Sequence, residues 1–173
     1  MVLLRYVYVL ALTVWLGGML VIGAVVAPAL FSTLTAQSPE TGRALAGAAF
    51  GVILSRFHYV AYASGALLVV SLTAMALLGP RPRSFAIRTA IAATMLGVAL
   101  YSGFIVLAEV DGIQRDVASA APAATIVLPS SLPGTDTRRL RFDHLHQLST
   151  RLMMFNVVAA LVLLVWEARE PAR

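Results

Sequence analysis

Four long apolar blocks alternate with short polar segments along the 173-residue chain. The blocks run from about Leu3 to Phe31, from Ala44 to Gly79, from Ala86 to Leu107 and from His144 to Trp166. A helix needs about 20 apolar residues to cross the roughly 30 Å hydrocarbon core of a bilayer. The pattern therefore predicts an all-α fold, a four-transmembrane-helix bundle that forms one membrane domain over residues 1–173.

The second block is too long for a single membrane span. At about 1.5 Å per residue, a helix over the whole block would be roughly 54 Å long, and Arg56 and His58 divide it. We therefore expect residues 41–55 to form a short helical extension outside the membrane, before the second span. Residues 118–141, rich in Ala, Pro, Ser and Thr, are expected to be a flexible outer connector. The spans themselves are predicted at residues 3–31, 57–78, 86–107 and 144–166.

Composition supports a membrane location. The chain is 60% hydrophobic and 12% charged, with a mean hydropathy of +0.86, whereas a soluble domain carries about a quarter charged residues. Because the apolar excess is gathered into long blocks, we interpret the chain as a multi-pass integral membrane protein, in contact with the lipid bilayer. The absence of cysteine excludes disulfides, thiolate metal sites and a catalytic thiol.

The charge pattern predicts the topology. All 13 basic residues are arginine, and the formal net charge is +5. With four spans, both termini and the turn at residues 79–88 share one side, and this turn holds three arginines and no acid. Short arginine-rich loops stay in the cytoplasm, so both termini are expected inside. The arginines flank apolar blocks, which argues against a nucleic-acid-binding surface.

Histidines open both spans that enter from the predicted outer face. His58 begins the second span, and His144 and His146 begin the fourth, within the stretch FDHLHQLSTRLMMFN. Two helices thus carry histidine at similar depth. Ionisable groups inside a membrane are costly and usually face the bundle interior or a water-filled cavity. Imidazole is also a common ligand of transition metals and of haem iron, so these positions form a candidate metal centre.

Helical spacing discriminates between the two histidines of the fourth span. Residues i and i+2 lie about 200° apart on a helix, so only one of His144 and His146 can point inward. If residues 144–146 are unwound, both imidazoles could converge. The helical alternative is favoured, with His146 inward. The face that it predicts holds His146, Ser149, Thr150, Met153 and Asn156, and the face of His144 holds Leu148, Arg151 and Phe155.

Each candidate residue also has a simpler interpretation. Arg56, Arg141 and Arg151 can extend to lipid headgroups, and Ser149 and Asn156 can hold helices together by hydrogen bonds. Met153 can be a core residue, and Glu109 can pair with Arg56 or Arg151 or be a boundary charge. No phosphate-binding loop, H-E-x-x-H zinc motif or G-x-S-x-G nucleophile motif occurs. The sequence therefore names no catalytic residue and favours a non-catalytic protein.

Short motifs along nearly the whole chain resemble the transmembrane-protein-205-like domain family, a bacterial membrane domain of unknown function. These motifs are Trp15-Leu16-Gly17-Gly18, Leu30-Phe31, Phe57-His58, Phe142 and His146-Gln147-Leu148-Ser149. The first motif is also similar to copper-resistance D-type membrane domains. The chain departs from the family at residues 103–109, where relatives tend to have a proline and an asparagine. The resemblance implies a four-helix membrane bundle without an established catalytic activity. Its eukaryotic members are linked to resistance to metal-containing drugs, and its motifs include His58 and His146.

Two hypotheses of different kinds follow. The first is a metal centre at the outer face for metal handling or electron transfer, either haem b between His58 and His146 or copper with help from Met153. The second is a non-catalytic accessory or assembly subunit of a larger membrane complex, in which the polar residues only join helices. A small transporter or resistance protein would require a homo-oligomer, because four spans are few. The residues expected around the centre are Arg56, Glu109, His144, Ser149, Arg151 and Asn156.

Overall fold

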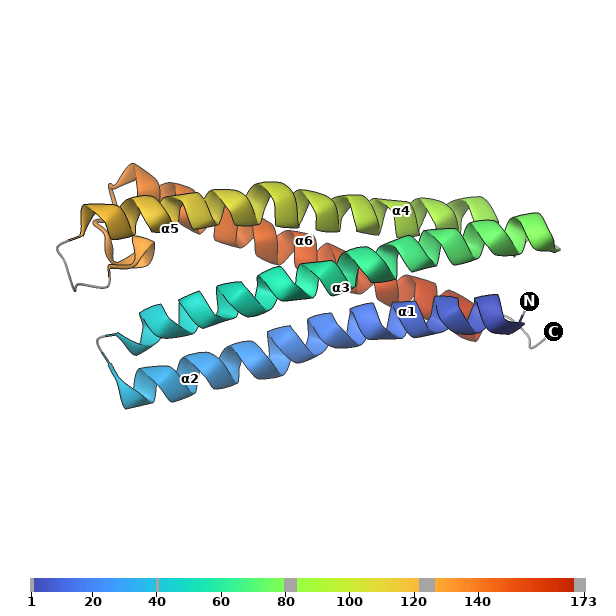
Figure 1. The fold of residues 1–173 in the computed structure, drawn as a ribbon, viewed down its shortest axis with the longest axis horizontal. Coiled ribbons are helices and arrows are strands. Elements are labelled where there is room, and N and C mark those ends of the chain that lie inside the picture. Colours follow the sequence, from blue (N-terminus) through green and yellow to red (C-terminus); the bar gives the residue numbers. More distant parts are fainter. Residues whose placement is uncertain (1, 40, 80–83, 122–126, 170–173) are drawn as a thin grey trace.

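The computed structural model describes residues 2–39, 41–79, 84–121 and 127–169, and it contains helices and no strand over these ranges. Both termini lie at the same end of an elongated bundle (Figure 1). The elements in chain order are α1 (Val2–Val21), η1 (Ile22–Val26), α2 (Ala27–Gln37), α3 (Gly42–Leu78), α4 (Phe85–Tyr101), η2 (Ser102–Leu107), α5 (Ala108–Ala120), η3 (Pro129–Ser131) and α6 (Thr137–Ala168).

These elements form four long rods, as the apolar blocks predicted. Val2–Gln37, Gly42–Leu78, Phe85–Ala120 and Thr137–Ala168 are each long and apolar enough to cross a membrane. The fold class is therefore confirmed, whereas the cytoplasmic placement of the termini stays a prediction. The rods are longer than the predicted spans. Residues 42–55 continue the second span in one helix, and α6 begins inside the predicted connector, of which residues 122–126 lie outside the described ranges.

The main core lies among four helices. α1 and α4 each pack against both α3 and α6, which places α3 and α6 at opposite corners. Large buried side chains from all four helices fill this core, and they include Leu12, Trp15, Leu68, Leu72, Met95 and Leu163. Lipid-facing positions account for the many exposed apolar side chains, because a bilayer solvates them as well as a protein core does.

Two rods contain a π-helical turn. η1 precedes Pro28, which has no backbone N–H to donate to the carbonyl of Ala24 four residues earlier. Proline therefore accounts for the π-helical turn in the first rod. η2 contains no proline. It includes Gly103, and side chains of α3 occupy the space that a side chain at this position would need. Single π-turns occur frequently at functional sites, so the surroundings of η2 are of interest.

A buried ion-pair network closes the end that carries the termini. Glu167 of α6 pairs with both Arg5 of α1 and Arg88 of α4. The Arg88 side chain is 1% exposed, and its guanidinium lies 5.0 Å from the centre of the Tyr8 ring. We call Arg5, Arg88 and Glu167 the clasp, because they join three helices. The sequence analysis treated Arg88 only as a topology signal and missed this role.

The opposite end is forked. The hairpin of α2 and the first half of α3 diverges from the hairpin of α5, η3 and the first half of α6 (Figure 1), and over the described residues α2 and α3 do not pack against α5, η3 or α6. The second hairpin has its own small core around Val106, Ile113, Val117 and Leu145. We call residues 27–56 the apolar hairpin and residues 108–151 the charged hairpin, after their composition.

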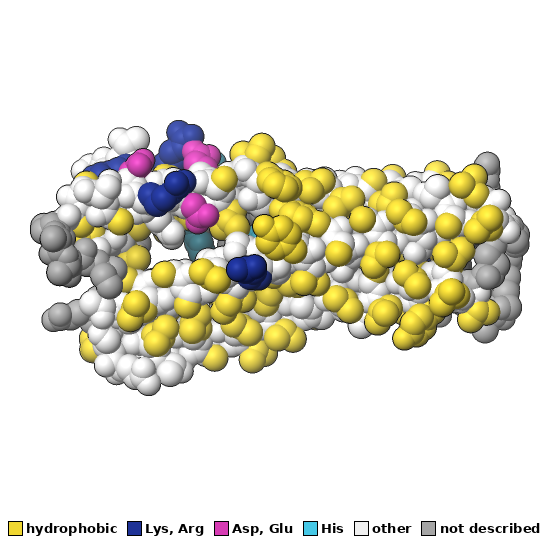
Figure 2. Space-filling model, viewed as in Figure 1, with side chains coloured by type: hydrophobic (Ala, Val, Ile, Leu, Met, Phe, Trp, Pro, Cys, Tyr) yellow, Lys and Arg dark blue, Asp and Glu magenta, His cyan; other side chains and the backbone are white. Residues whose placement is uncertain are grey.

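The distance from the clasp to the base of the fork matches the thickness of the hydrocarbon core of a bilayer. Twenty helical residues span about 30 Å, and this count leads from Arg88 to Ala108 and from Glu167 to Gln147. Both endpoints lie near charged side chains at the fork end, and apolar side chains dominate the surface between the two ends of the bundle (Figure 2). A bilayer whose one edge lies at the clasp therefore ends near the base of the fork.

Candidate functional site

His58 is oriented by its own helix. Its Nδ1 donates a hydrogen bond to the carbonyl oxygen of Leu54 at 2.8 Å, since a carbonyl can only accept. A neutral imidazole that donates through Nδ1 leaves Nε2 with a free lone pair. Nε2 has no hydrogen-bond partner in the described part of the chain. The half-buried ring therefore presents one fixed acceptor or metal ligand at the base of the fork.

Gly103 makes room for this histidine. A Cβ atom at Gly103 would lie 2.7 Å from Cδ2 of His58 and 1.9 Å from the Tyr62 hydroxyl. The Tyr62 ring stacks on Phe104 of η2, with centroids 5.5 Å apart and planes 7° from parallel. The edge of His58 next to Nε2 therefore faces η2, between α3 and α4. The sequence analysis missed Tyr62 and Gly103, although the sequence departs from the resembled family at this place.

The pairing of Arg141 with Glu109 gives one estimate of the depth of His146 relative to His58. Arg141 pairs with Glu109, which aligns α6 with α5. Because the two rods are antiparallel, five residues further along α6 reach His146, and five residues back reach Phe104. Phe104 adjoins Gly103, the neighbour of His58. Figure 2 shows histidine side chains inside the hollow of the fork, below acidic groups. Counted from the clasp instead, Gly103 beside His58 lies about 22 Å along its rod and His146 about 32 Å along α6. The similarity of depth therefore stays a prediction.

The two histidines of α6 flank a buried leucine. His144 and His146 are exposed, whereas Leu145 belongs to the core of the charged hairpin. The His146 ring stacks on Phe142, with centroids 6.4 Å apart and planes 8° from parallel. No hydrogen bond or ring contact joins His146 to His58 among the described residues. The inward assignment of His146 remains a prediction.

The other residues of the predicted inward face divide by depth. Asn156 is buried and Ser149 and Met153 are half-buried, whereas Thr150 is exposed. Met153 packs against the main core, and its Cε would lie 3.4 Å from a Cβ at Gly23. Met153 lies seven residues, or about 10 Å along the axis, from His146. Because that separation exceeds what two ligands of one small ion span comfortably, Met153 and His146 are poor partners for one copper ion.

The charged residues pair differently from the sequence proposal. Glu109 pairs with Arg141 rather than with Arg56 or Arg151, because Arg141 lies opposite it on the neighbouring helix. Arg56 and Arg151 are exposed and have no ion-pair partner in the described ranges. Asn156 is 5% exposed, and its Oδ1 has no hydrogen-bond partner among the described residues.

A shallow groove between α5 and α6 completes the fork. It encloses about 350 Å³, and its lining residues are Glu109, Gly112, Ile113, Asp116, Thr137, Arg138 and Arg141.

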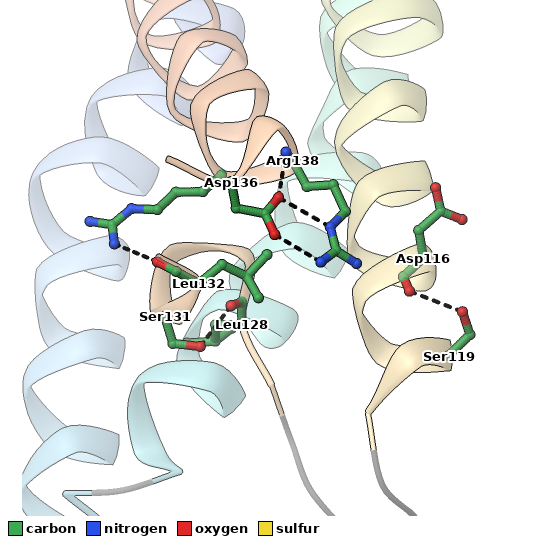
Figure 3. A network of polar contacts seen from close by, with 8 residues as sticks. Asp116, Ser119, Leu128, Ser131, Leu132, Asp136 and Arg138 are labelled. Carbon is green, nitrogen blue, oxygen red and sulfur yellow. Dashed lines mark hydrogen bonds and ion pairs between the residues drawn. The ribbon is translucent and has the colours of Figure 1, made fainter. Parts of the chain in front are cut away.

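Asp136 caps α6 by accepting a hydrogen bond from the Arg138 backbone N–H at 2.8 Å, and it also binds the Arg138 guanidinium (Figure 3). The side-chain bonds from Arg138, and then its backbone N–H, hold the pKa of the Asp136 carboxyl below its ordinary value. The Asp136-Thr137 pair was a helix-start signal in the sequence.

No group of three or more His, Cys, Asp or Glu side chains within the described ranges is placed to hold a metal ion. A centre at the fork would therefore depend on two protein ligands, or on methionine and exogenous ligands. Bis-imidazole haem needs only two. The geometry offers one oriented imidazole at His58, and the helix at the opposite corner carries a second histidine, His146, on its fork-end half.

Comparison with known proteins gives one match. No curated protein and no solved structure matches the chain. A family model does match residues 10–119, from the middle of α1 to the end of α5. The match includes His58 and Gly103, and it ends before α6 and its histidines. It fits an uncharacterised membrane domain, but it shows neither the transmembrane-protein-205-like resemblance nor the copper-resistance D-type resemblance. The chain thus belongs to the family described as the domain of unknown function DUF4149.

Proposed function

We propose that this integral membrane protein binds a metal centre at the base of the fork, for metal handling or electron transfer. The observation that carries the proposal is the orientation of His58. A hydrogen bond from Nδ1 to a backbone carbonyl fixes the tautomer and aims Nε2, which is how proteins commonly prepare a metal-ligating histidine. His58 also lies within the part of the chain that the family model matches.

Haem b suits the proposal better than a bare copper ion. Haem needs only two axial imidazoles, and His58 and His146 come from helices at opposite corners of the bundle. A copper ion would need further ligands close to both histidines, and Met153 lies about 10 Å along the axis from His146. His146 would have to turn from Phe142 towards the hollow to serve as the second ligand.

The test is a spectrum and a metal analysis of the purified full-length protein, produced with and without added haem. We expect a Soret band at one haem per chain, lost in His58→Ala and strongly weakened in His146→Ala. His144→Ala is the matched control, because His144 is exposed on the same helix turn, and it should keep the band. A wild-type protein with neither a Soret band nor stoichiometric metal would refute the proposal.

The second candidate is an accessory subunit of a larger membrane complex. It is favoured by the apolar hairpin, because α2 contributes no buried residue and Val52 is 61% exposed beyond the expected bilayer edge. In this case the native assembly, sized after mild solubilisation, should shrink to the free chain in Val52→Arg. Arg115→Glu on the charged hairpin should leave it unchanged. An assembly of unchanged size in both variants would count against this candidate.

A further inference from the structure

The arginines at the fork end differ in their partners. Arg115 bonds to the carbonyl oxygen of Asp111, and neither Arg115 nor Arg43 has a carboxylate partner in the described ranges. Three arginines beyond the expected bilayer edge pair with carboxylates of the same chain, and these pairs are Arg138 with Asp136, Arg139 with Asp143 and Arg141 with Glu109. Two arginines nearer the bilayer, Arg56 and Arg151, have no carboxylate partner in the described part of the chain. Both side chains are exposed. Their partner must therefore come from outside these residues.

Arg56 and Arg151 lie at the same depth. Arg151 is 16 residues from Glu167, which is about 24 Å along α6. Arg56 lies two residues beyond His58, whose neighbour Gly103 is 15 residues from Arg88. That path of 17 residues amounts to about 26 Å from the clasp. Both backbones thus lie just inside a hydrocarbon core about 30 Å thick.

The direction of the two helices places the guanidinium groups of Arg56 and Arg151 closer to the fork end than their own backbones. Side chains on an α-helix lean towards its N-terminus, and α3 and α6 both begin at the fork end. An arginine that leans this way and extends about 6 Å brings its guanidinium to the edge of the hydrocarbon, at headgroup level. Figure 2 shows a basic side chain at the place where the apolar surface meets the hollow. An arginine at this depth on α1 or α4 would lean into the hydrocarbon instead.

We propose that Arg56 and Arg151 each bind the phosphodiester of a phospholipid in the leaflet at the fork end, and that they prefer lipids with a net negative charge. A guanidinium offers a planar pair of donors that matches phosphate oxygens. Because Glu109 is already paired with Arg141, the two free guanidinium groups leave a local charge of +2 at this level. Tyr59, which is 67% exposed one turn from Arg56, adds an aromatic interface residue.

The experiment compares lipids retained by the full-length protein in nanodiscs of equal phosphatidylglycerol and phosphatidylcholine content. Native mass spectrometry should find phosphatidylglycerol enriched on the wild type, by about fivefold for each arginine at low salt. Arg56→Gln with Arg151→Gln should abolish the enrichment. Arg115→Gln is the matched control, because Arg115 also lacks a carboxylate partner but bonds to the Asp111 carbonyl oxygen on the charged hairpin.

Each further outcome bears on the proposal. Equal retention of both lipids by the wild type, or unchanged enrichment in the double variant, would overturn it. Inorganic phosphate at millimolar concentration should not displace the lipid, and displacement would assign the groups to a free anion. The Arg56→Lys, Arg151→Lys variant keeps the charge without the paired donors. It should retain part of the enrichment, which separates lost binding from lost folding.

Discussion

Gly103 is the position where one added methyl group has the largest calculable effect on the candidate site. In Gly103→Ala, the new Cβ would lie 1.9 Å from the Tyr62 hydroxyl oxygen and 2.7 Å from Cδ2 of His58, whereas ordinary contact begins at 3.4 Å. The hydroxyl would have to retreat by about 1.5 Å. Tyr62 cannot do so freely, because its ring stacks on Phe104, and His58 is held by the Leu54 carbonyl.

The expected cost follows from these contacts. Overpacking of this kind destabilises a protein by about 1–3 kcal/mol, and loss of an aromatic stack adds about 0.5–1.5 kcal/mol. Gly97→Ala is the matched control on the same rod, because nothing lies within 4 Å of its Cβ position. There alanine should stabilise the helix by up to about 1 kcal/mol. The free energies of unfolding of the two variants should therefore differ by about 1.5–5.5 kcal/mol.

The assay is reversible unfolding in mixed micelles, followed by far-ultraviolet circular dichroism at increasing denaturing detergent. Tyr62→Phe supplies an internal test, because it removes the oxygen nearest the new methyl group. In the Gly103→Ala background it should recover part of the lost stability, although His58 still limits the space. If Gly103→Ala is as stable as Gly97→Ala, or if Tyr62→Phe recovers nothing, the contact between α3 and η2 is not as described.

Three other substitutions test separate parts of the fold. Glu167→Gln should destabilise the bundle by about 3–5 kcal/mol in the same assay, because it leaves the buried Arg88 guanidinium without its carboxylate. A joint Arg88→Leu, Glu167→Leu variant should lose less stability, and equal losses in the two variants would contradict this role of the clasp. Asn156→Leu should be neutral or stabilising, because the buried Oδ1 has no partner among the described residues, and a loss above about 1 kcal/mol would reveal a bond that the structure lacks. Because the pKa of Asp136 is lowered in the folded state, the stability that its carboxylate adds is present above the ordinary aspartate pKa and is lost as the pH falls through the folded-state pKa. Acid should therefore speed hydrogen exchange at the start of α6 in the wild type, and it should change this exchange less in Asp136→Asn.

The sequence predicted those features that depend on composition and period. Four apolar blocks of membrane length became four rods, and the division of the second block at Arg56 coincides with the expected bilayer edge. The similar depth expected for His58 and His146 stays a prediction, because it depends on how the helices are aligned as well as on the constant helical rise. The helices extended further than predicted, since polar residues from Thr137 onward still form backbone hydrogen bonds once Asp136 caps them.

Features that depend on partner choice were not predictable. Glu109 had three candidate arginines, and only the packing of α5 against α6 selects Arg141. The joint pairing of Glu167 with Arg5 and Arg88 joins residues from three rods, and no local pattern marks it. Gly103 is one of 12 glycines, and its importance follows from the side chains that α3 places against it. Such contacts require the three-dimensional arrangement.

The unequal ends of the bundle determine where a ligand can enter. At the clasp, a buried network joins α1, α4 and α6, so local opening there must break buried ion pairs. At the fork, α2 buries no residue and the charged hairpin has a separate core, so the two hairpins can move apart without disturbing the main core. Local stability falls where few apolar side chains are buried. Opening should therefore begin at the fork, beside His58, and hydrogen exchange should be faster in α2 than in α4.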